Sequence, residues 1–198
     1  YDKRHGYRGP ATNLAPLPNE DETELRTRWL QALEPVPTYG NQQPAIVTAV
    51  EPRSFNALLS DGTEITVPWE GIGWAYAFRS RNEAWPPPQT ASDAVSLGDM
   101  IRVRRIGGSW ELGQVPEIQG ALVSMRPSNG ELVALIGGYD FRRSQVNRVL
   151  TPRPPGSNFK PFVYGAALED GYTAATLIND APLTRGDYRP NNFENNFL

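Results

Sequence analysis

Cysteine is absent from this chain of 198 residues, and histidine occurs once, as His5. Without cysteine the chain can form neither a disulfide framework nor a thiolate metal site. A single histidine excludes a histidine-rich metal site and argues against a serine–histidine–aspartate triad. Any nucleophilic side chain in this sequence is therefore expected to use a base other than histidine.

Charge and hydropathy exclude two further classes of protein. The 19 basic and 22 acidic residues give a net charge of −3, and no basic stripe with interleaved aromatics occurs, so no nucleic-acid partner is expected. No apolar run approaches the ~18 residues that span a bilayer, and no signal peptide is visible at Tyr1. Nothing in the sequence suggests a metal or an organic cofactor.

Lysine is also scarce, and one of only two lysines follows a serine at an informative place. Ser157-Asn158-Phe159-Lys160 lies between a Pro-Pro-Gly segment and the apolar run 162–168, and proline and glycine at that point predict a helix start. A serine there sits where free backbone N–H groups favour developing negative charge. A lysine three residues on shares its helical face. This places an amine within reach of a hydroxyl, the arrangement of acylating serine enzymes that work without histidine.

The tetrapeptide alone is a weak signal. About one S-x-x-K is expected by chance in a chain of this length, and the alternative interpretation is a surface serine near a solvated lysine. The other lysine is Lys3, and arginine carries the remaining positive side-chain charge. Because the pKa of a lysine shifts readily on burial whereas arginine stays protonated, Lys160 is the better candidate for a base.

Three features follow one another in the C-terminal part of the chain. Residues 120–141 predict a β-hairpin, because Asn129-Gly130 separates two apolar runs. Behind the hairpin come Asn147-Arg148, the Pro-Pro-Gly-Ser-x-Phe-Lys-Pro-Phe segment that contains Ser157, and Asn179-Asp180-Ala181-Pro182. This order resembles the start of the transpeptidase domain of class A penicillin-binding proteins, the bifunctional cell-wall synthases, and is most similar to their 1A type. S-x-x-K is the first of three motifs in that superfamily.

The N-terminal part predicts a linker and one helix. Residues 1–18 are polar and broken by glycine and proline, which is typical of a linker. Residues 20–33 place apolar side chains at helical spacing, and the prolines at 35 and 37 end the pattern. Trp29 is interpreted as a packing residue of this helix rather than a ligand contact.

Residues 44–118 predict a small antiparallel β-domain. A strand is expected at 45–50, and Asp61-Gly62 and Gly107-Gly108 each separate two strand-like runs. Strands at this spacing indicate a barrel or sandwich, and the segment resembles an OB-type barrel of the kind that 1A-type synthases carry before the transpeptidase domain. The aromatic run from Trp69 to Pro88, which includes Trp85, is expected to fill the barrel core; the alternative is a surface that binds a glycan or a partner protein.

The fold class expected for the chain is α+β. A small antiparallel OB-like β-barrel domain is followed by the N-terminal part of a penicillin-binding, β-lactamase-like transpeptidase domain. The predicted division is 1–40 for the linker with its amphipathic helix, 41–118 for the OB-like domain and 119–198 for the transpeptidase part. The β-domain carries no cluster of catalytic residue types and is expected to do no chemistry.

The resemblance implies a serine-type D-Ala-D-Ala transpeptidase of peptidoglycan synthesis. Ser157 would attack the penultimate D-alanine carbonyl of a stem peptide, and Lys160 would accept the serine proton. An amine of a neighbouring stem peptide would then take the acyl group. β-Lactam antibiotics, which mimic D-Ala-D-Ala, would be trapped on Ser157. This activity links the family to the cell wall, cell shape and antibiotic resistance.

The resemblance also implies parts and partners outside the sequence. The family carries a membrane anchor and a glycosyltransferase domain upstream, so the expected location is the periplasmic face of the bacterial inner membrane, anchored by a segment outside this chain. The remainder of the transpeptidase domain is an expected partner of residues 119–198. A regulatory protein is a further expected partner, docking on the β-domain.

The sequence departs from the family pattern in a way that leaves alternatives open. Downstream of Ser157 neither the Ser-x-Asn motif nor the Lys-Thr/Ser-Gly strand is present. The chain is therefore expected to be an interior fragment that is inactive by itself. A second interpretation is a non-catalytic docking or regulatory fragment of the same synthase. A third, a related β-lactamase or β-lactam sensor, is disfavoured because those proteins do not usually follow a linker helix and an inserted β-domain.

Overall fold

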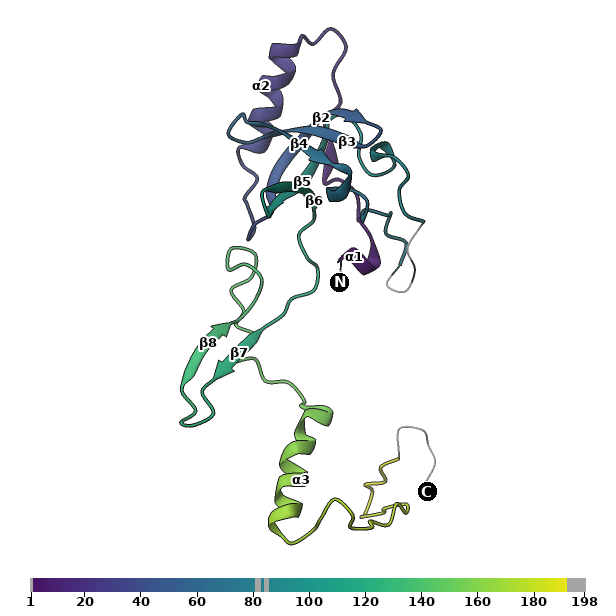
Figure 1. Cartoon of the computed structure of the whole chain (residues 1–198), viewed down its shortest axis with the longest axis vertical. Coiled ribbons are helices and arrows are strands. Elements are labelled where there is room, and N and C mark those ends of the chain that lie inside the picture. Colours follow the sequence, from purple (N-terminus) through teal and green to yellow (C-terminus); the bar gives the residue numbers. More distant parts are fainter. Residues whose placement is uncertain (1, 81–82, 84–85, 192–198) are drawn as a thin grey trace. The chain divides into compact units, whose positions relative to one another are not determined.

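The computed structural model describes residues 2–80, 83 and 86–191 of the chain (Figure 1). It divides into two compact units, Tyr1–Thr151 and Pro152–Leu198. The mixture of helices and antiparallel sheets confirms the predicted α+β class. None of the described helices is both long and apolar enough to cross a membrane.

Six strands of the first unit form one sheet, in the order β1-β5-β2-β3-β4, with β6 also paired to β5. All of these pairs are antiparallel. Strands β4 and β6 contact each other as well, which curls the sheet toward a small barrel. The strands are β1 (Thr12–Asn13), β2 (Gln43–Glu51), β3 (Ser54–Leu59), β4 (Glu64–Pro68), β5 (Asp99–Ile106) and β6 (Ser109–Gly113), accompanied by helix α1 (Asp2–His5) and the 3-10 turns η1 (Trp69–Gly71) and η2 (Ala91–Asp93).

The sheet separates two hydrophobic cores. On β2, Ala45 and Val47 face the larger core inside the curled sheet, whereas Ile46 between them faces a smaller core on the outside. On β3, Phe55 joins the larger core and Leu58 the smaller one. Successive side chains of a strand point to opposite faces, so one apolar strand can serve both cores.

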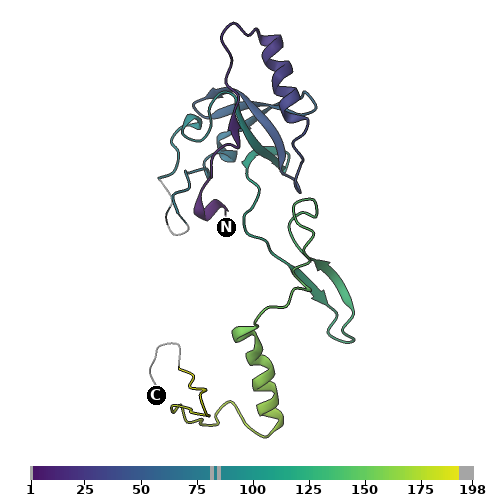
Figure 2. The ribbon, with the colours of Figure 1, turned by 180° about the vertical axis from the view of Figure 1, so that it is seen from behind.

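Helix α2 (Glu22–Leu33) covers the outer core, and the front and back views both show it lying against the sheet (Figures 1 and 2). It begins with a capping box, in which the Asp21 carboxylate accepts from the Glu24 backbone N–H and the Glu24 side chain accepts from the Asp21 N–H. Trp29 and Leu33 are its buried residues. The predicted helix and the packing role of Trp29 are confirmed.

Two predicted hairpin turns are confirmed. Asp61-Gly62 joins β3 to β4, and the Asp61 carboxylate accepts from the Thr63 backbone N–H at 2.9 Å. Gly107 and Gly108 join β5 to β6 with φ of +56° and +90°. Two successive residues with positive φ match the twist of antiparallel strands, and glycine adopts this conformation without strain.

The N-terminal segment differs from the expected linker, because it takes part in the sheet. Thr12 and Asn13 pair with β5, and the carbonyl oxygen of Leu14 accepts from the Trp29 indole N–H at 2.8 Å. Tyr7 is only 4% exposed and belongs to the larger core. Glycine and proline are frequent here because the segment turns repeatedly. Their frequency therefore does not mean that the segment is separate from the sheet.

Part of the aromatic loop after β4 packs on the larger core, as predicted, through Trp69 and Trp74. Trp69 and Trp74 are partly buried against that core, and the indole N–H of Trp74 donates to the Leu112 carbonyl oxygen at 3.1 Å. The guanidinium carbon of Arg53 lies 4.3 Å from the centroid of the Trp69 ring. Trp85, which belonged to the same prediction, lies outside the described residues.

A second, two-stranded sheet follows in the first unit. Strands β7 (Leu122–Met125) and β8 (Leu132–Ile136) form the hairpin predicted around Asn129-Gly130. Its loop is closed by the Arg126 N–H, which donates to the Glu131 carbonyl oxygen at 2.8 Å. Every residue of both strands is exposed, including their large apolar side chains.

Candidate functional site

Ser157 and Lys160, the two residues predicted to carry the chemistry, lie in the second unit at the start of a helix. Ser157 belongs to the 3-10 turn η3 (Gly156–Phe159), and Lys160 is the first residue of helix α3 (Lys160–Glu169). The sequence predicted that a helix starts at the serine. The regular α-helix instead starts at the lysine, and the serine occupies the tighter turn that leads into it.

A backbone hydrogen bond connects the two residues directly. The N–H of Lys160 donates to the carbonyl oxygen of Ser157. In a 3-10 turn three residues complete one revolution, so side chains at positions i and i+3 project from the same side. The predicted sharing of a face by the hydroxyl and the amine therefore follows from the backbone of this turn.

Proline and glycine explain why the chain turns here. Pro155 precedes the turn with φ of −70°, and Gly156 adopts φ of +52°, a left-handed conformation that costs glycine least. Pro161 lies in the first turn of α3, where a missing N–H costs no helical hydrogen bond. The residues on either side of Ser157 thus fix its place at the helix entrance.

The surroundings of the two side chains are open. Both residues are exposed, and neither side chain has a hydrogen-bond or ion-pair partner among the described residues. The first turn of α3 carries no acidic side chain. Free N–H groups at this end of the helix favour negative charge, so an oxyanion formed at Ser157 would be stabilised there.

Helix α3 presents an uncovered apolar surface within its unit. No residue of the helix is buried. The rings of Phe159 and Phe162 contact each other, with centroids 5.7 Å apart. Val163, Tyr164 and Leu168 are each more than half exposed. Side chains of this kind are normally packed against other elements, so the helix has the composition of a core helix.

No metal site accompanies the serine and the lysine in the described part of the chain. Among residues 2–80, 83 and 86–191, no group of three or more histidine, aspartate or glutamate side chains could hold a metal ion.

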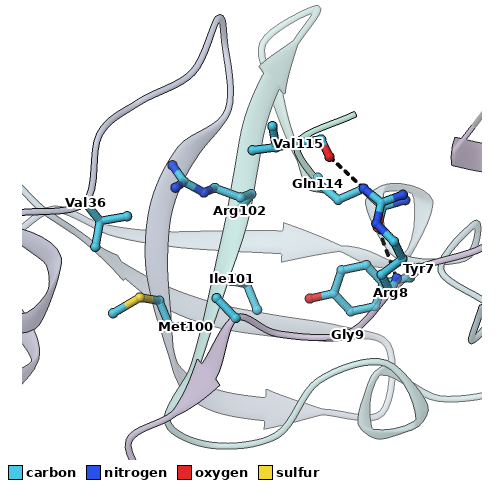
Figure 3. Close-up of a pocket in the computed structure, with 11 residues that line it drawn as sticks. Tyr7, Arg8, Gly9, Val36, Met100, Ile101, Arg102, Gln114 and Val115 are labelled. Atoms are coloured by element: carbon cyan, nitrogen blue, oxygen red, sulfur yellow. Dashed lines mark hydrogen bonds between the residues drawn. The ribbon is translucent and has the colours of Figure 1, made fainter. Parts of the chain in front are cut away.

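Tyr7 and Arg102, which line a cavity in the β-sheet domain (Figure 3), were not predicted from the sequence. These two residues are far apart in the sequence and belong to different parts of the fold, so no local pattern could reveal the cavity.

Two family models match the chain. The model described as penicillin-binding protein OB-like domain covers residues 7–118, more than half of the chain. The model described as penicillin-binding protein transpeptidase domain covers residues 120–196, a range that includes Ser157 and Lys160. The OB-like domain and the start of a transpeptidase domain are thus present, in the predicted order. The division at residues 40/41 and 118/119 stays a prediction.

Known relatives extend this result over the whole chain. Penicillin-binding protein 1A of Escherichia coli strain K12 is 42% identical over 188 residues, which cover 94% of this chain and 22% of the relative. Penicillin-binding protein 1A of Pseudomonas aeruginosa is 42% identical over 206 residues, which cover 100% of this chain and 24% of the relative. The chain therefore spans about a quarter of the length of these two relatives.

A solved structure agrees with the sequence comparisons. The crystal structure of penicillin-binding protein 1A from Haemophilus influenzae matches 100% of this chain and 28% of that protein, with a TM-score of 0.70 and 29% identity. The same kind of protein is thus found by family model, by sequence and by fold. An OB-like domain that leads into the start of a transpeptidase domain, with 1A-type relatives along its whole length, shows that this chain belongs to the class A penicillin-binding proteins.

Proposed function

We propose that Ser157 is the nucleophile, and Lys160 the proton acceptor, of a peptidoglycan D,D-transpeptidase in the whole protein. One observation carries the proposal. The two residues lie one 3-10 turn apart, on the same side of the chain, at the entrance of a helix within the range matched by the transpeptidase model. The single histidine and the scarcity of lysine support the pairing, because the sequence offers few other nitrogen bases and no acidic side chain lies in the first turn of α3.

The first half-reaction forms an ester. The Ser157 hydroxyl oxygen attacks the carbonyl carbon of the penultimate D-alanine in a stem peptide, and its proton passes to the Lys160 amine. The tetrahedral oxyanion is stabilised by hydrogen-bond donors, one of which is the Ser157 backbone N–H. The peptide bond to the terminal D-alanine then breaks, its nitrogen takes the proton from Lys160, and free D-alanine leaves.

The second half-reaction returns the enzyme to its starting state. An amine from a neighbouring stem peptide attacks the ester carbonyl and gives a proton to Lys160. The serine oxygen leaves and takes the proton back, so the peptide cross-link forms with no net change in the enzyme. Lys160 has to be uncharged when each attack begins, which a burying partner surface would favour.

β-Lactam antibiotics would enter at the same serine. Attack by Ser157 opens the four-membered ring by breaking its carbonyl–nitrogen bond, and the nitrogen takes the proton. The leaving group stays attached to the acylated product, so it blocks the approach of an acceptor amine. The expected product is a stable penicilloyl ester on Ser157.

The wider setting is proposed from the family. In the whole protein a glycosyltransferase domain and a membrane anchor would accompany this chain, and the site would face the bacterial periplasm. Substrates would be peptidoglycan stem peptides that end in D-Ala-D-Ala. The remainder of the transpeptidase domain would cover α3 and contribute the Ser-x-Asn and Lys-Thr/Ser-Gly groups. A regulatory protein could be held by the β-domain.

Labelling with a fluorescent penicillin tests this proposal in a protein that contains the complete transpeptidase domain. The wild type is expected to be labelled at one site, identified by mass spectrometry of the peptide that contains Ser157. Ser157→Ala should abolish labelling, whereas Ser128→Ala, which changes an exposed serine in the β7–β8 loop, should leave it intact. Continued labelling of Ser157→Ala, in a variant with an unchanged melting temperature, would show that the nucleophile is a different residue.

A further inference from the structure

The chain that leads to Ser157 is anchored against the end of strand β8. The Arg148 N–H donates to the carbonyl oxygen of Gly137, the residue that directly follows β8, at 2.9 Å. Every residue of β7 and β8 is exposed, whereas residues 137–140 and 147–149 are partly buried. Burial in this part of the chain is therefore concentrated around the contact between Gly137 and the segment that precedes the serine.

The contact requires a residue without a side chain at position 137. A methyl group on Gly137 would lie 2.6 Å from the side-chain oxygen of Asn147 and 3.1 Å from its Cα atom. Non-bonded carbon atoms are best separated by about 3.5–4 Å, so an alanine here would push Asn147 away from β8. At Gly120, by contrast, a methyl group would meet no atom within 4 Å.

Asn147 closes the anchored segment into a turn through its own oxygens. Its side-chain oxygen accepts from the Val149 N–H at 3.1 Å. Its carbonyl oxygen accepts from the Leu150 N–H at 3.2 Å and from the Thr151 hydroxyl at 3.0 Å. An asparagine side chain that bonds to the backbone two residues on stabilises a turn. Residues 147–151 are therefore held in one conformation up to Thr151.

The connector from this turn to the serine is short and stiff. Residues 152–155 read Pro-Arg-Pro-Pro, and Gly156 precedes Ser157. Proline fixes its own φ near about −65° and restricts the residue before it to extended conformations. Thr151 and Arg153 each precede a proline, so they are restricted as well. Most of a displacement at Thr151 would therefore reach Ser157 and would not be absorbed on the way.

We propose that Asn147 is a positioning residue for the transpeptidase reaction, because its turn and its contact with Gly137 set the point from which the connector carries Ser157. This inference rests on the proposed function of Ser157 as the nucleophile. Asn147 acts through the backbone and is assigned no contact with the substrate. Misplacement of a reacting group by about 1 Å can slow a reaction about a hundredfold, since attack needs the reacting atoms about 3–3.5 Å apart.

Three variants weaken this anchor in different ways, in a protein that contains the complete transpeptidase domain. Asn147→Ala removes the side-chain acceptor, and Gly137→Ala pushes the turn away from β8. In stopped-flow experiments with a fluorescent penicillin, both should lower the acylation rate constant at saturation about tenfold or more and leave the noncovalent dissociation constant unchanged. Thr151→Val removes one hydroxyl at nearly constant shape and should slow acylation severalfold. Asn147→Asp keeps an acceptor oxygen and should restore most of the rate.

Matched controls change the same residue types elsewhere in the chain. The Asn129 side-chain oxygen accepts from the Glu131 N–H at 3.1 Å, so Asn129→Ala removes an equivalent bond from the β7–β8 loop. Gly120→Ala adds a methyl group where the space is open. Both controls should be acylated at the wild-type rate. Melting temperatures of all variants show whether each is folded, and Thr151→Val, the mildest change, decides the question if the two alanine variants are not.

The dependence of acylation on pH separates positioning from a change in the base. The midpoint of the rate against pH should match the wild type in every variant, because Lys160 is unaltered. The double variant Asn147→Ala/Gly137→Ala should be no slower than the slower single variant, since both changes release one contact. A shifted midpoint, a wild-type rate in Asn147→Ala or in Thr151→Val, or an Asn147→Asp variant as slow as Asn147→Ala would each overturn the proposal.

Mass spectrometry of the labelled peptide distinguishes this inference from the proposed function. A label on Ser157 together with unchanged rates in the anchor variants refutes the positioning role alone. A label on a different residue refutes the proposed nucleophile, and the positioning role of Asn147 with it.

Discussion

The backbone N–H of Gly40 donates to a carboxylate oxygen of Asp140 at 2.7 Å, although 100 residues separate the two in the sequence. Gly40 lies just before β2, and Asp140 follows β8. Beside this bond, the Tyr139 hydroxyl donates to the Tyr39 carbonyl oxygen at 3.1 Å. These two bonds connect the segment after the exposed hairpin to the start of the OB-like sheet.

We expect Asp140→Ala to release this connection. Removal of the Asp140 carboxylate should speed hydrogen exchange at the Gly40 amide severalfold, because the amide loses its acceptor. Asp187→Ala, at an exposed aspartate of the second unit, is the matched control and should leave the Gly40 rate unchanged. Equal Gly40 exchange rates in the wild type and Asp140→Ala would contradict the expected role.

The same bond predicts a pH dependence. The Gly40 N–H is the main cause that lowers the pKa of Asp140 below the ordinary value of 3.8. A lowered pKa in the folded state means that the ionised carboxylate adds stability at pH above that ordinary value. This contribution is lost as the pH falls through the lowered pKa. Gly40 exchange, corrected for its intrinsic pH dependence, should therefore lose protection on acidification in the wild type but not in Asp140→Ala.

Lys160→Arg should separate charge from basicity at the proposed active site. Arginine keeps a positive charge at similar length but cannot accept a proton near neutral pH. In a protein with the complete transpeptidase domain, the rate of penicillin acylation should fall on the order of a hundredfold or more. Stopped-flow acylation kinetics measure this, with Arg185→Lys as an exposed control. Acylation of Lys160→Arg at the wild-type rate would point to another base.

The 198-residue chain by itself is expected not to be acylated. It contains neither Ser-x-Asn nor Lys-Thr/Ser-Gly downstream of Ser157. In the proposed mechanism the Lys-Thr/Ser-Gly strand would supply the second oxyanion donor. Loss of one such donor alone typically slows acyl transfer about a hundred- to a thousandfold. Incubation with a fluorescent penicillin followed by intact mass measurement gives the answer. Stoichiometric addition of the antibiotic to this chain would refute the expectation.

Trp29→Ala should destabilise the β-sheet domain strongly. Trp29 is 5% exposed in the outer core, and its indole N–H donates to the Leu14 carbonyl oxygen. Truncation of a buried tryptophan typically costs about 3–5 kcal/mol of unfolding free energy. Leu17→Ala removes a side chain that is 56% exposed and should change stability by less than about 0.5 kcal/mol. Urea titration followed by fluorescence of the remaining tryptophans measures both variants.

Two versions of the isolated domain should differ in stability. Residues 7–118 include Tyr7, strand β1 and helix α2, all of which pack on the sheet. Residues 41–118 lack them and would expose the outer core. We expect both to give a β-type circular dichroism spectrum, but the longer version should melt cooperatively and at a clearly higher temperature. Equal melting temperatures would show that the N-terminal segment adds nothing to the domain.

Local patterns predicted much of the secondary structure, because its signals are local. The helix up to Leu33 follows from apolar spacing, and the turns at Asp61-Gly62 and Gly107-Gly108 follow from glycine conformation. The serine–lysine pair is predictable in the same way, since four residues of sequence suffice to describe it. What it does in the whole protein depends on groups beyond this local pattern.

Long-range pairing was not predictable in this way. Residues before α2 look like a linker because their glycines and prolines suppress any periodic pattern, yet Thr12 and Asn13 add to the sheet edge. The backbone of Tyr7 is hydrogen-bonded to Tyr76 and Phe78, which lie on a loop far along the chain. Such contacts follow from the assembled fold, and a single sequence carries no direct record of them.

The two-sided packing of β2 restricts how this domain can change in evolution. A single-residue insertion before Val47 would turn Ala45 toward helix α2 and Ile46 toward the interior, so both cores would be mispacked at once. The irregular register between Val47 and Ala49 already absorbs one such residue. Length variation among related domains should therefore collect in the hairpin turns and in the aromatic loop, while β2 keeps its residue count.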